Sequence, residues 1–300
     1  MEGKRDREGE SCHMIHADHT LARRLENLIC AEFRRLAEVA QAVIPEARAE
    51  CMDAAGGVAL WLGEGSPVNQ AVGLAMEGLV EESELERLES FYHERGAAAI
   101  TSVCPLADPS LLPALGRRGW IATEFEHLLV LELDERGPSG ALGAKIGGTG
   151  GSGPDAELDV RVCGPEERGA WARVATLGFS DGQPPGQGHD EFGRIMAARD
   201  EAILVLAWID GEPVGTGSLV IYGGVGWLSG DSTLPQYRRR GVQQAVQRHR
   251  LQLARGAGCD LAVTEAAPGG VSQRNMERLG FRIAYTHVEF VKASGGPSSP

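Results

Sequence analysis

The sequence lacks a long hydrophobic run and is short of positive charge. No apolar stretch approaches the roughly 18 residues of a membrane-spanning helix, so we expect no membrane span. Lysine and arginine number 29 against 42 aspartates and glutamates, which gives a net charge of −13. Non-specific nucleic-acid binding requires basic side chains that neutralise phosphates, so we expect no nucleic-acid partner. The 42% hydrophobic and 24% charged composition is typical of a soluble globular protein.

Paired cysteine patterns are also missing. The six cysteines form no C-x-x-C pair, and no histidine cluster accompanies them. We therefore expect neither a disulfide framework nor a metal site, and we expect reduced thiols in the cytoplasm. The first residues combine charge with no apolar core, so they predict a disordered tail at 1–18 and not a secretory signal.

A glycine- and serine-rich run, GPSGALGAKIGGTGGSGP, divides the chain. It has no apolar period and is typical of a flexible connection. We place the linker at 137–156, between one domain at 19–136 and another at 157–293, with a second disordered tail at 294–300. Both halves are long enough to form a domain.

The C-terminal half has a readable pattern of elements. It predicts strands at 157–163, 202–209, 213–222, 225–234 and 260–266, and helices at 164–179, 189–199, 241–255 and 269–280. Residues 281–292 predict one or two closing strands. Three arginines of the 241–255 helix (Arg248, Arg250 and Arg255) are expected on its solvent-exposed face.

The end of the N-terminal half repeats this order. A strand at 97–107 and a short helix at 109–119 precede a return strand, and a shift of 161 positions brings Gly119-Trp120 onto Gly280-Phe281. Identities are few, so two unrelated αβ segments are the alternative. The same shift carries Arg238–Gly241 onto Glu77–Val80, where further glutamates follow and would repel a phosphate. If the halves are repeats, only the C-terminal half is expected to bind an anionic cofactor.

The stretch LPQYRRRGVQQA at 234–245 lies between a strand-like run and a helix-like segment. It places a glycine turn and three arginines at a helix N-terminus. Free backbone N–H groups and the positive end of the helix dipole meet there, which suits a phosphate or pyrophosphate. The chain lacks G-x-x-x-x-G-K-[ST], which disfavours a P-loop-like nucleotide site.

Over roughly 157–292, this order of elements around RRRGVQQA resembles the GNAT (GCN5-related N-acetyltransferase) family. Arg238 and Gly241 match the family pattern Gln/Arg-x-x-Gly-x-Gly/Ala, and Gln243 stands where glycine or alanine is usual. The N-terminal half resembles a degenerate copy, as in tandem members. The resemblance implies an α/β (α+β) fold of two GNAT-like domains, each a mixed, mostly antiparallel sheet flanked by helices. It also implies a splayed central strand pair in the C-terminal domain.

The resemblance further implies an N-acetyltransferase that uses acetyl-CoA as co-substrate. The acceptor would be a primary amine of a small molecule or peptide, which attacks directly in a ternary complex. Pantetheine would enter between strands 225–234 and 260–266. The residues implied in cofactor binding are Thr233, Leu234, Arg238, Arg239, Arg240, Gly241, Val242, Gln243, Gln244, Ala245 and Asn275. A degenerate copy would serve packing, substrate enclosure or dimer contacts, so a homodimer stays open.

Three side chains are candidates for the chemistry. Glu265, near the end of its strand, is a candidate base for the amine; Asp231 is a second, with a bulge residue after a glycine as its alternative role. In the family, a tyrosine about four residues before the Gly-Phe pair often protonates the leaving thiolate, and here that position is Met276. Tyr285 is the substitute candidate, with a packing role as its alternative. Because the usual acid is missing, a non-catalytic acyl-CoA-binding or sensing module is the alternative function.

Overall fold

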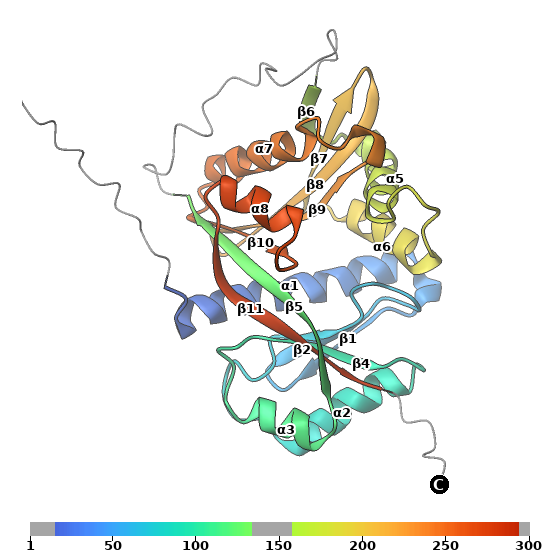
Figure 1. Ribbon diagram of the computed structural model, residues 1–300. Coiled ribbons are helices and arrows are strands. Elements are labelled where there is room, and N and C mark those ends of the chain that lie inside the picture. Colours follow the sequence, from blue (N-terminus) through green and yellow to red (C-terminus); the bar gives the residue numbers. More distant parts are fainter. Residues whose placement is uncertain (1–15, 134–157, 294–300) are drawn as a thin grey trace, which may run out of the picture.

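The computed structural model describes residues 16–133 and 158–293 of the 300 (Figure 1). The expected linker at 137–156 and tail at 294–300 lie outside the described residues. The N-terminal half contains α1 (His19–Val43), η1 (Pro45–Ala47), β1 (Glu50–Ala54), β2 (Gly57–Trp61), β3 (Ala71–Val72), α2 (Glu82–His93), β4 (Ala99–Val103), α3 (Leu111–Arg117) and β5 (Ile121–Glu132).

The C-terminal half follows the element order that the sequence predicts, and its boundaries agree within a few residues. It contains β6 (Leu158–Val162), η2 (Pro165–Glu167), α5 (Arg168–Phe179), α6 (Gln187–Ala198), β7 (Ile203–Ile209), β8 (Glu212–Tyr222), β9 (Val225–Thr233), η3 (Pro235–Tyr237), α7 (Val242–Gly256), β10 (Leu261–Ala266), α8 (Val271–Arg278) and β11 (Arg282–Lys292). The closing segment is one long strand. The predicted α/β class, with a mostly antiparallel sheet flanked by helices, is confirmed.

All strands join one 11-stranded sheet in the order β1-β2-β3-β4-β11-β5-β10-β9-β8-β7-β6. The last strand of each half has crossed to the other half. β11 pairs with β4 and β5, whereas β5 pairs with β11 and β10. The two halves are therefore intertwined through the long central pair that crosses in Figure 1.

The pairing of β5 with β11 has an internal two-fold symmetry. Arg282 pairs with Val130, and Val291 pairs with Ile121, which is the same pair after the 161-residue shift. His287 lies opposite Glu126, and these two positions also exchange under the shift. The repeat inferred from sequence is thus present in the element order and in the strand register.

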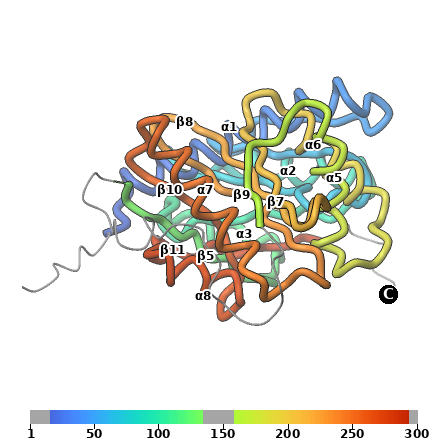
Figure 2. Tube along the Cα trace, turned by 90° about the horizontal axis from the view of Figure 1, so that it is seen from above, coloured from blue at the N-terminus to red at the C-terminus, as the bar shows by residue number. Residues whose placement is uncertain are grey.

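Helices cover both faces of the sheet. On one face, Leu129 and Leu131 of β5 pack with residues of α7 and α8; on the other, Leu128 and Val130 pack with α1. Figure 2 shows α1 and α8 on opposite sides of the sheet. The alternation follows from the two-residue period of a strand, which sends successive side chains to opposite faces.

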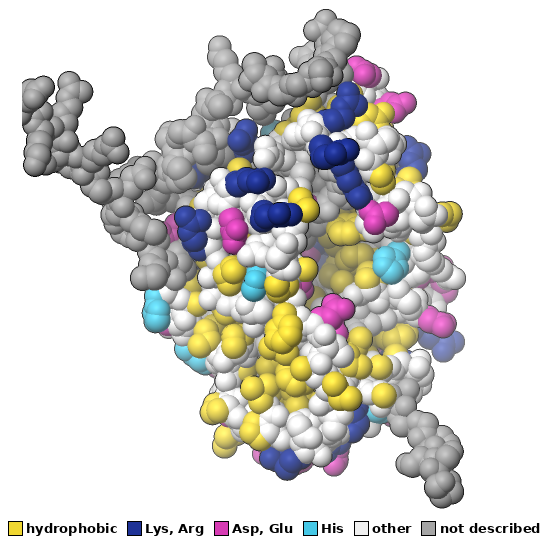
Figure 3. Space-filling view, viewed as in Figure 1, with side chains coloured by type: hydrophobic (Ala, Val, Ile, Leu, Met, Phe, Trp, Pro, Cys, Tyr) yellow, Lys and Arg dark blue, Asp and Glu magenta, His cyan; other side chains and the backbone are white. Residues whose placement is uncertain are grey.

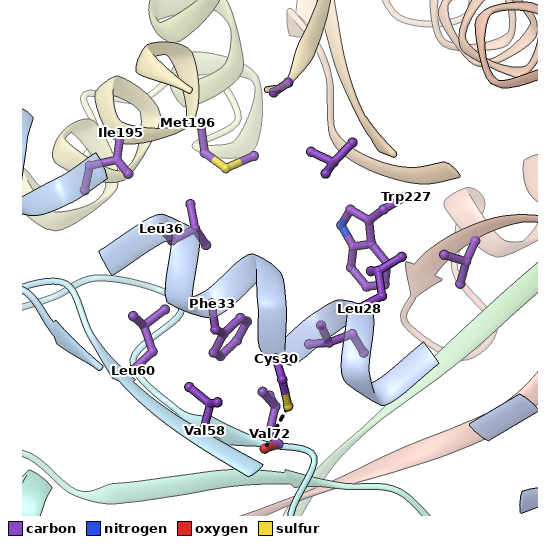
Figure 4. Packing of buried hydrophobic residues seen from close by; sticks show 14 of the residues in the cluster. Leu28, Cys30, Phe33, Leu36, Val58, Leu60, Val72, Ile195, Met196 and Trp227 are labelled. Atoms are coloured by element: carbon purple, nitrogen blue, oxygen red, sulfur yellow. Dashed lines mark hydrogen bonds between the residues drawn. The ribbon is translucent and has the colours of Figure 1, made fainter. Parts of the chain in front are cut away.

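α1 is the main connection between the halves on its face. Leu36 points toward Ile195 and Met196 of α6, and Phe33 lies beside Leu60 of β2 (Figure 4). At the start of the helix, Asp18 accepts a hydrogen bond from the Leu21 amide at 2.8 Å and so caps it.

Several ion pairs join α1 to the C-terminal half, and those of Arg24 and Glu32 also involve further hydrogen bonds. Arg24 donates to Asp260 at 2.8 Å and to the Gly223 carbonyl at 2.8 Å. The fully buried Arg199 pairs with Glu32 and also donates to the Ser218 hydroxyl at 2.9 Å. Since a buried charge without a partner is costly, the Arg199 pair fixes where α1 docks.

Candidate functional site

The central strands of the C-terminal half separate into a fork. β9 and β10 are parallel and pair at only three positions, the last being Val263 with Trp227. Beyond this point β9 pairs only with β8, and β10 only with β5. Thr264 donates its hydroxyl to the Leu228 carbonyl at 3.0 Å, which marks where the fork opens. The predicted splayed pair is confirmed, and it leaves an edge of β9 free of a strand neighbour.

A bulge in β9 lies along this fork. The register shifts between the pairs Thr216–Ser232 and Ser218–Ser229, and Gly230 in the bulge has φ +65°. Asp231, a candidate base, is the next residue, and its carboxylate pairs with Arg250. The bulge role that the sequence left open for Asp231 is thus the one in the structure.

The expectation that Arg250 lies on the solvent-exposed face of α7 is wrong. Its side chain is fully buried and does not lie on the solvent-exposed face. It donates to the carbonyls of Ser218 at 2.9 Å and Ser229 at 3.0 Å, besides its pair with Asp231. A Cβ on Gly217 would lie 2.7 Å from the Arg250 Nε, so the glycine makes room for the guanidinium.

The N-terminus of α7 is open. Gly241 precedes the helix with φ +82°, no side chain caps it, and a Cβ there would have no neighbour within 4 Å. Among the described residues, no hydrogen bond is donated by the backbone N–H groups of residues 242–244. These donors and the helix dipole together suit a phosphate.

The equivalent helix of the N-terminal half is closed by its own residues. α2 begins after Glu81, whose amide N–H donates a hydrogen bond to the Glu84 side chain at 3.4 Å in a capping box. Carboxylates thus occupy the position that is open in α7. This contrast agrees with the expectation of one anionic ligand, held by the C-terminal half.

Two of the three loop arginines have partners within the protein. Arg238 forms an ion pair with Asp181 at 2.7 Å and donates to the Gly178 carbonyl at 2.9 Å, so it ties the end of α5 to the loop. The Arg240 guanidinium lies 5.5 Å from the ring centre of Tyr237. Arg239 has φ +63° and is exposed.

The start of α7 also contacts α8. Asn275 donates its amide to the Gln243 side-chain oxygen at 2.7 Å, and Arg278 donates to the Asn275 oxygen at 3.3 Å. The structure therefore brings these two predicted cofactor residues together, and they hold the two helices side by side. Met276, at the position of the usual tyrosine, is buried in the core behind them.

A cluster of ionisable side chains lies below the fork, on the α1 face. Glu265 stands two residues beyond the last β9–β10 pair, and its Oε1 lies 3.7 Å from Nδ1 of His287. The other imidazole nitrogen, Nε2, lies 2.7 Å from Oε1 of Glu26. Tyr285 donates its hydroxyl to the same Glu26 oxygen at 2.8 Å. Two strands, β10 and β11, and α1 therefore contribute to one cluster.

The pKa values in this cluster are strongly perturbed. Burial, and then the charge of Glu126, raise the pKa of Glu265 to about 8, against the opposing effect of His287. The Glu265 side chain nevertheless keeps 29% of its exposure, so it remains accessible from the cleft. For His287, burial is the largest effect and lowers the pKa, but the carboxylates of Glu26, Glu265 and Glu126 together outweigh it and the net direction is upward. Burial raises the pKa of Tyr285 far above its ordinary value.

Sequence reasoning did not identify Glu26, Glu126 or His287. Glu26 lies 259 residues from Tyr285 along the chain, and no local pattern links a helix to a strand over such a distance. The 161-residue shift carries the available signal, because it makes Glu126 equivalent to His287. In the structure these two residues lie opposite each other in the β5–β11 pair.

Charged and hydrophobic side chains lie on different parts of the surface (Figure 3). Figure 3 shows Lys and Arg side chains over the C-terminal half, above a hollow in the middle of the face, with hydrophobic side chains prominent below. No helix among the described residues is long and apolar enough to cross a membrane. Within the same ranges, no three His, Cys, Asp or Glu side chains converge as metal ligands.

Residues 171–281 match the family model of the Acetyltransferase (GNAT) family. The chain therefore carries a GNAT acetyltransferase domain in its C-terminal half, as the resemblance predicted. No curated protein matches the chain.

Solved structures share the fold over most of the chain. A GCN5-related N-acetyltransferase from Kribbella flavida is 19% identical with a TM-score of 0.57, over 88% of this chain and 96% of that one. A tandem GNAT protein from the clavulanic acid biosynthesis pathway is 14% identical with a TM-score of 0.55, over 81% of this chain and 80% of that one. A conserved protein of unknown function from Staphylococcus epidermidis is 12% identical with a TM-score of 0.54, over 82% of this chain and 95% of that one.

Proposed function

We propose that this protein is an acetyl-CoA-dependent N-acetyltransferase that acts on a primary amine. The observation that carries the proposal is the combination of an open fork with an uncapped helix N-terminus at its mouth. A pantetheine arm can pair with the free edge of β9, and the pyrophosphate fits the backbone N–H groups of residues 241–244. Arg239 and Arg240 are the cations near those phosphates. Arg238 acts indirectly, by holding the loop through Asp181.

Glu265 is the proposed general base. It lies at the fork, keeps access to the cleft, and has a pKa near the working pH, which favours a base that must both accept and release a proton. It takes a proton from the ammonium group of the acceptor. The free amine nitrogen then attacks the thioester carbonyl carbon, a C–N bond forms, the nitrogen releases its second proton to solvent, and the C–S bond breaks.

The leaving thiolate takes its proton from solvent in this proposal. Met276 has no acidic proton. The Tyr285 hydroxyl donates its hydrogen bond to Glu26 of α1. Tyr285 is therefore a positioning residue for Glu26, and Asp231 is a structural partner of Arg250. Thr233, Leu234 and the Gln243–Asn275 pair shape the cofactor side of the fork.

The test is acetyl-CoA binding by calorimetry, followed by thiol release with a panel of primary amines. The expected result is binding by the wild-type protein and by Glu265→Gln, with turnover only in the wild type. Absence of acetyl-CoA binding would overturn the proposal. Binding without thiol release for any amine would instead support the alternative, an acyl-CoA-binding or sensing module, which the missing tyrosine at position 276 favours.

A further inference from the structure

The open face of the central strand pair carries a row of carboxylates. Glu124 and Glu126 alternate along β5 on the α1 face, and both are exposed. Glu289 of β11 lies directly opposite Glu124, and Glu265 of β10 is opposite Leu128, one pleat beyond Glu126. At about 3.4 Å per residue, the row extends over roughly 14 Å from the fork.

The outer part of this row has no ion-pair partner among the described residues, and the one opposing charge that acts on Glu126 is that of His287 opposite it. No ion pair of those residues includes Glu124, Glu126 or Glu289. The one neutral donor to the row is the Thr123 hydroxyl, which binds Glu289 at 2.6 Å. Like charges directly opposite each other destabilise a sheet, so the Glu124–Glu289 pair has a cost in the protein alone.

His287 supplies an independent indication of a ligand. Its imidazole is only 3% exposed, and Nδ1 faces the acidic row 3.7 Å from Glu265 without a hydrogen-bond partner. The other ring nitrogen is already committed to Glu26. A buried polar atom without a hydrogen-bond partner is costly, and a polar group of a ligand bound at Glu265 would supply that partner.

The distances between the carboxylates indicate what kind of ligand they can bind. The carboxylates are spread along two strands, and no three described side chains converge on a single point as metal ligands do. A chain that carries separate positive charges matches this spread better than one ion. The end of the row at Glu265 coincides with the proposed site of acetyl transfer.

We propose that the acceptor is an aliphatic amine with at least one further cationic group, which binds along Glu124, Glu126 and Glu289 while its reacting amine lies at Glu265. This inference rests on the proposed function for the identity of the reacting end. The second charge is held by Coulomb attraction to several like-charged carboxylates at once, and this attraction weakens as salt is added. An amine with only one charge gains nothing from the outer carboxylates.

The experiment compares 1,8-diaminooctane, whose second ammonium can reach the outer carboxylates, with octylamine, which has the same chain length and one charge fewer. Equilibrium binding to the CoA-bound protein is measured by calorimetry, and thiol release gives kcat/KM. For the wild type we expect the diamine to exceed the monoamine by at least tenfold in both measurements. The double variant Glu124→Gln, Glu289→Gln is expected to lose most of this preference, because the diamine loses much more affinity than octylamine does.

Glu132→Gln is the matched control, because it removes the same charge from the other end of β5 and should keep the preference. Equal binding of the two amines, or a preference that survives in the double variant, would overturn the inference. Selective binding of the diamine without thiol release would leave the inference standing and overturn the proposed function. Turnover of both amines without preference would overturn the inference and leave the proposed function standing.

Discussion

His287 on β11 lies directly opposite Glu126 on β5, and the pairing of these strands reads the same in both directions from that point. The two residues occupy equivalent positions in the two halves. One half contributes a carboxylate and the other an imidazole, so the centre of a symmetric pair of strands is chemically asymmetric. Both side chains influence the pKa of Glu265, in opposite directions.

The first prediction concerns the pH dependence of acetyl transfer. Glu265 must be deprotonated to act as base, and its pKa is about 8, so the rate should rise as pH increases through about 8. The charged groups that act on Glu265 are Glu126 on β5, His287 on β11 and Glu26 on α1. Glu126→Gln removes a negative neighbour and should shift the profile of kcat/KM to lower pH. An unchanged profile would exclude Glu265 as the titrating group.

The second prediction is the opposite shift in a partner variant. A protonated His287 lowers the pKa of Glu265, and the carboxylate of Glu26 favours that protonated form. His287→Gln should therefore move the same profile to higher pH. The ionisation of the amine in solution is identical in both variants, so opposite shifts can come only from the protein. Shifts in the same direction would contradict this arrangement.

The third prediction separates the roles of the two candidate bases. Glu265→Gln should lower kcat by about 10²–10⁴-fold, the usual contribution of a general base. Asp231→Asn leaves the buried Arg250 without its counter-charge, and loss of one partner of a buried ion pair costs about 3–5 kcal/mol. Urea unfolding and steady-state kinetics on both variants provide the check. A stable but inactive Asp231→Asn protein would reverse the assignment.

The third prediction extends to stability, because the Glu265 carboxyl also binds its proton differently in the folded and unfolded states. Its carboxyl has an ordinary pKa of 4.5 in the unfolded chain and about 8 in the folded protein. Between these values the folded state keeps a proton that the unfolded chain has lost, so the free energy of unfolding falls as pH rises across that window. Glu265→Gln has no such proton and should show a shallower decline. Unfolding curves from pH 5 to 8 measure the difference.

The fourth prediction tests the phosphate site without disturbing the helix. A glutamate in the first turn of α7 is favourable to the helix dipole but repels a phosphate. Gln244→Glu should therefore weaken acetyl-CoA binding by tenfold or more while unfolding is unchanged, and Gln244→Ala serves as the neutral control. Equal affinity for acetyl-CoA in both variants would place the phosphates elsewhere.

The fifth prediction concerns the docking of α1. Arg199→Met leaves Glu32 buried without its partner, and the expected loss is about 3–5 kcal/mol in the free energy of unfolding. Adding Glu32→Leu removes the stranded charge and should recover much of that loss. A single variant as stable as the wild type would show that the pair contributes little to the contact between the halves.

Local periodicity and turn residues predicted the element order of the C-terminal half and the loop at the helix start, whereas the fork was predicted by the family resemblance. The sequence did not predict the burial of Arg250. Arg248, Arg250 and Arg255 share one helix, but only Arg250 faces a glycine and a bulge carboxylate on neighbouring strands. Nor did it predict that α1 contributes Glu26, since that contact depends on how two distant segments pack.

The exchange of strands has a consequence for how the chain is made. β11 is the last described strand to leave the ribosome, yet its position lies between β4 and β5, which are synthesised long before it. At about 5–20 residues per second, a gap in the N-terminal sheet persists for on the order of ten seconds during synthesis. The unpaired edges of β4 and β5 are open to wrong partners throughout that interval. The N-terminal half can therefore complete its sheet only after nearly the whole chain has been synthesised.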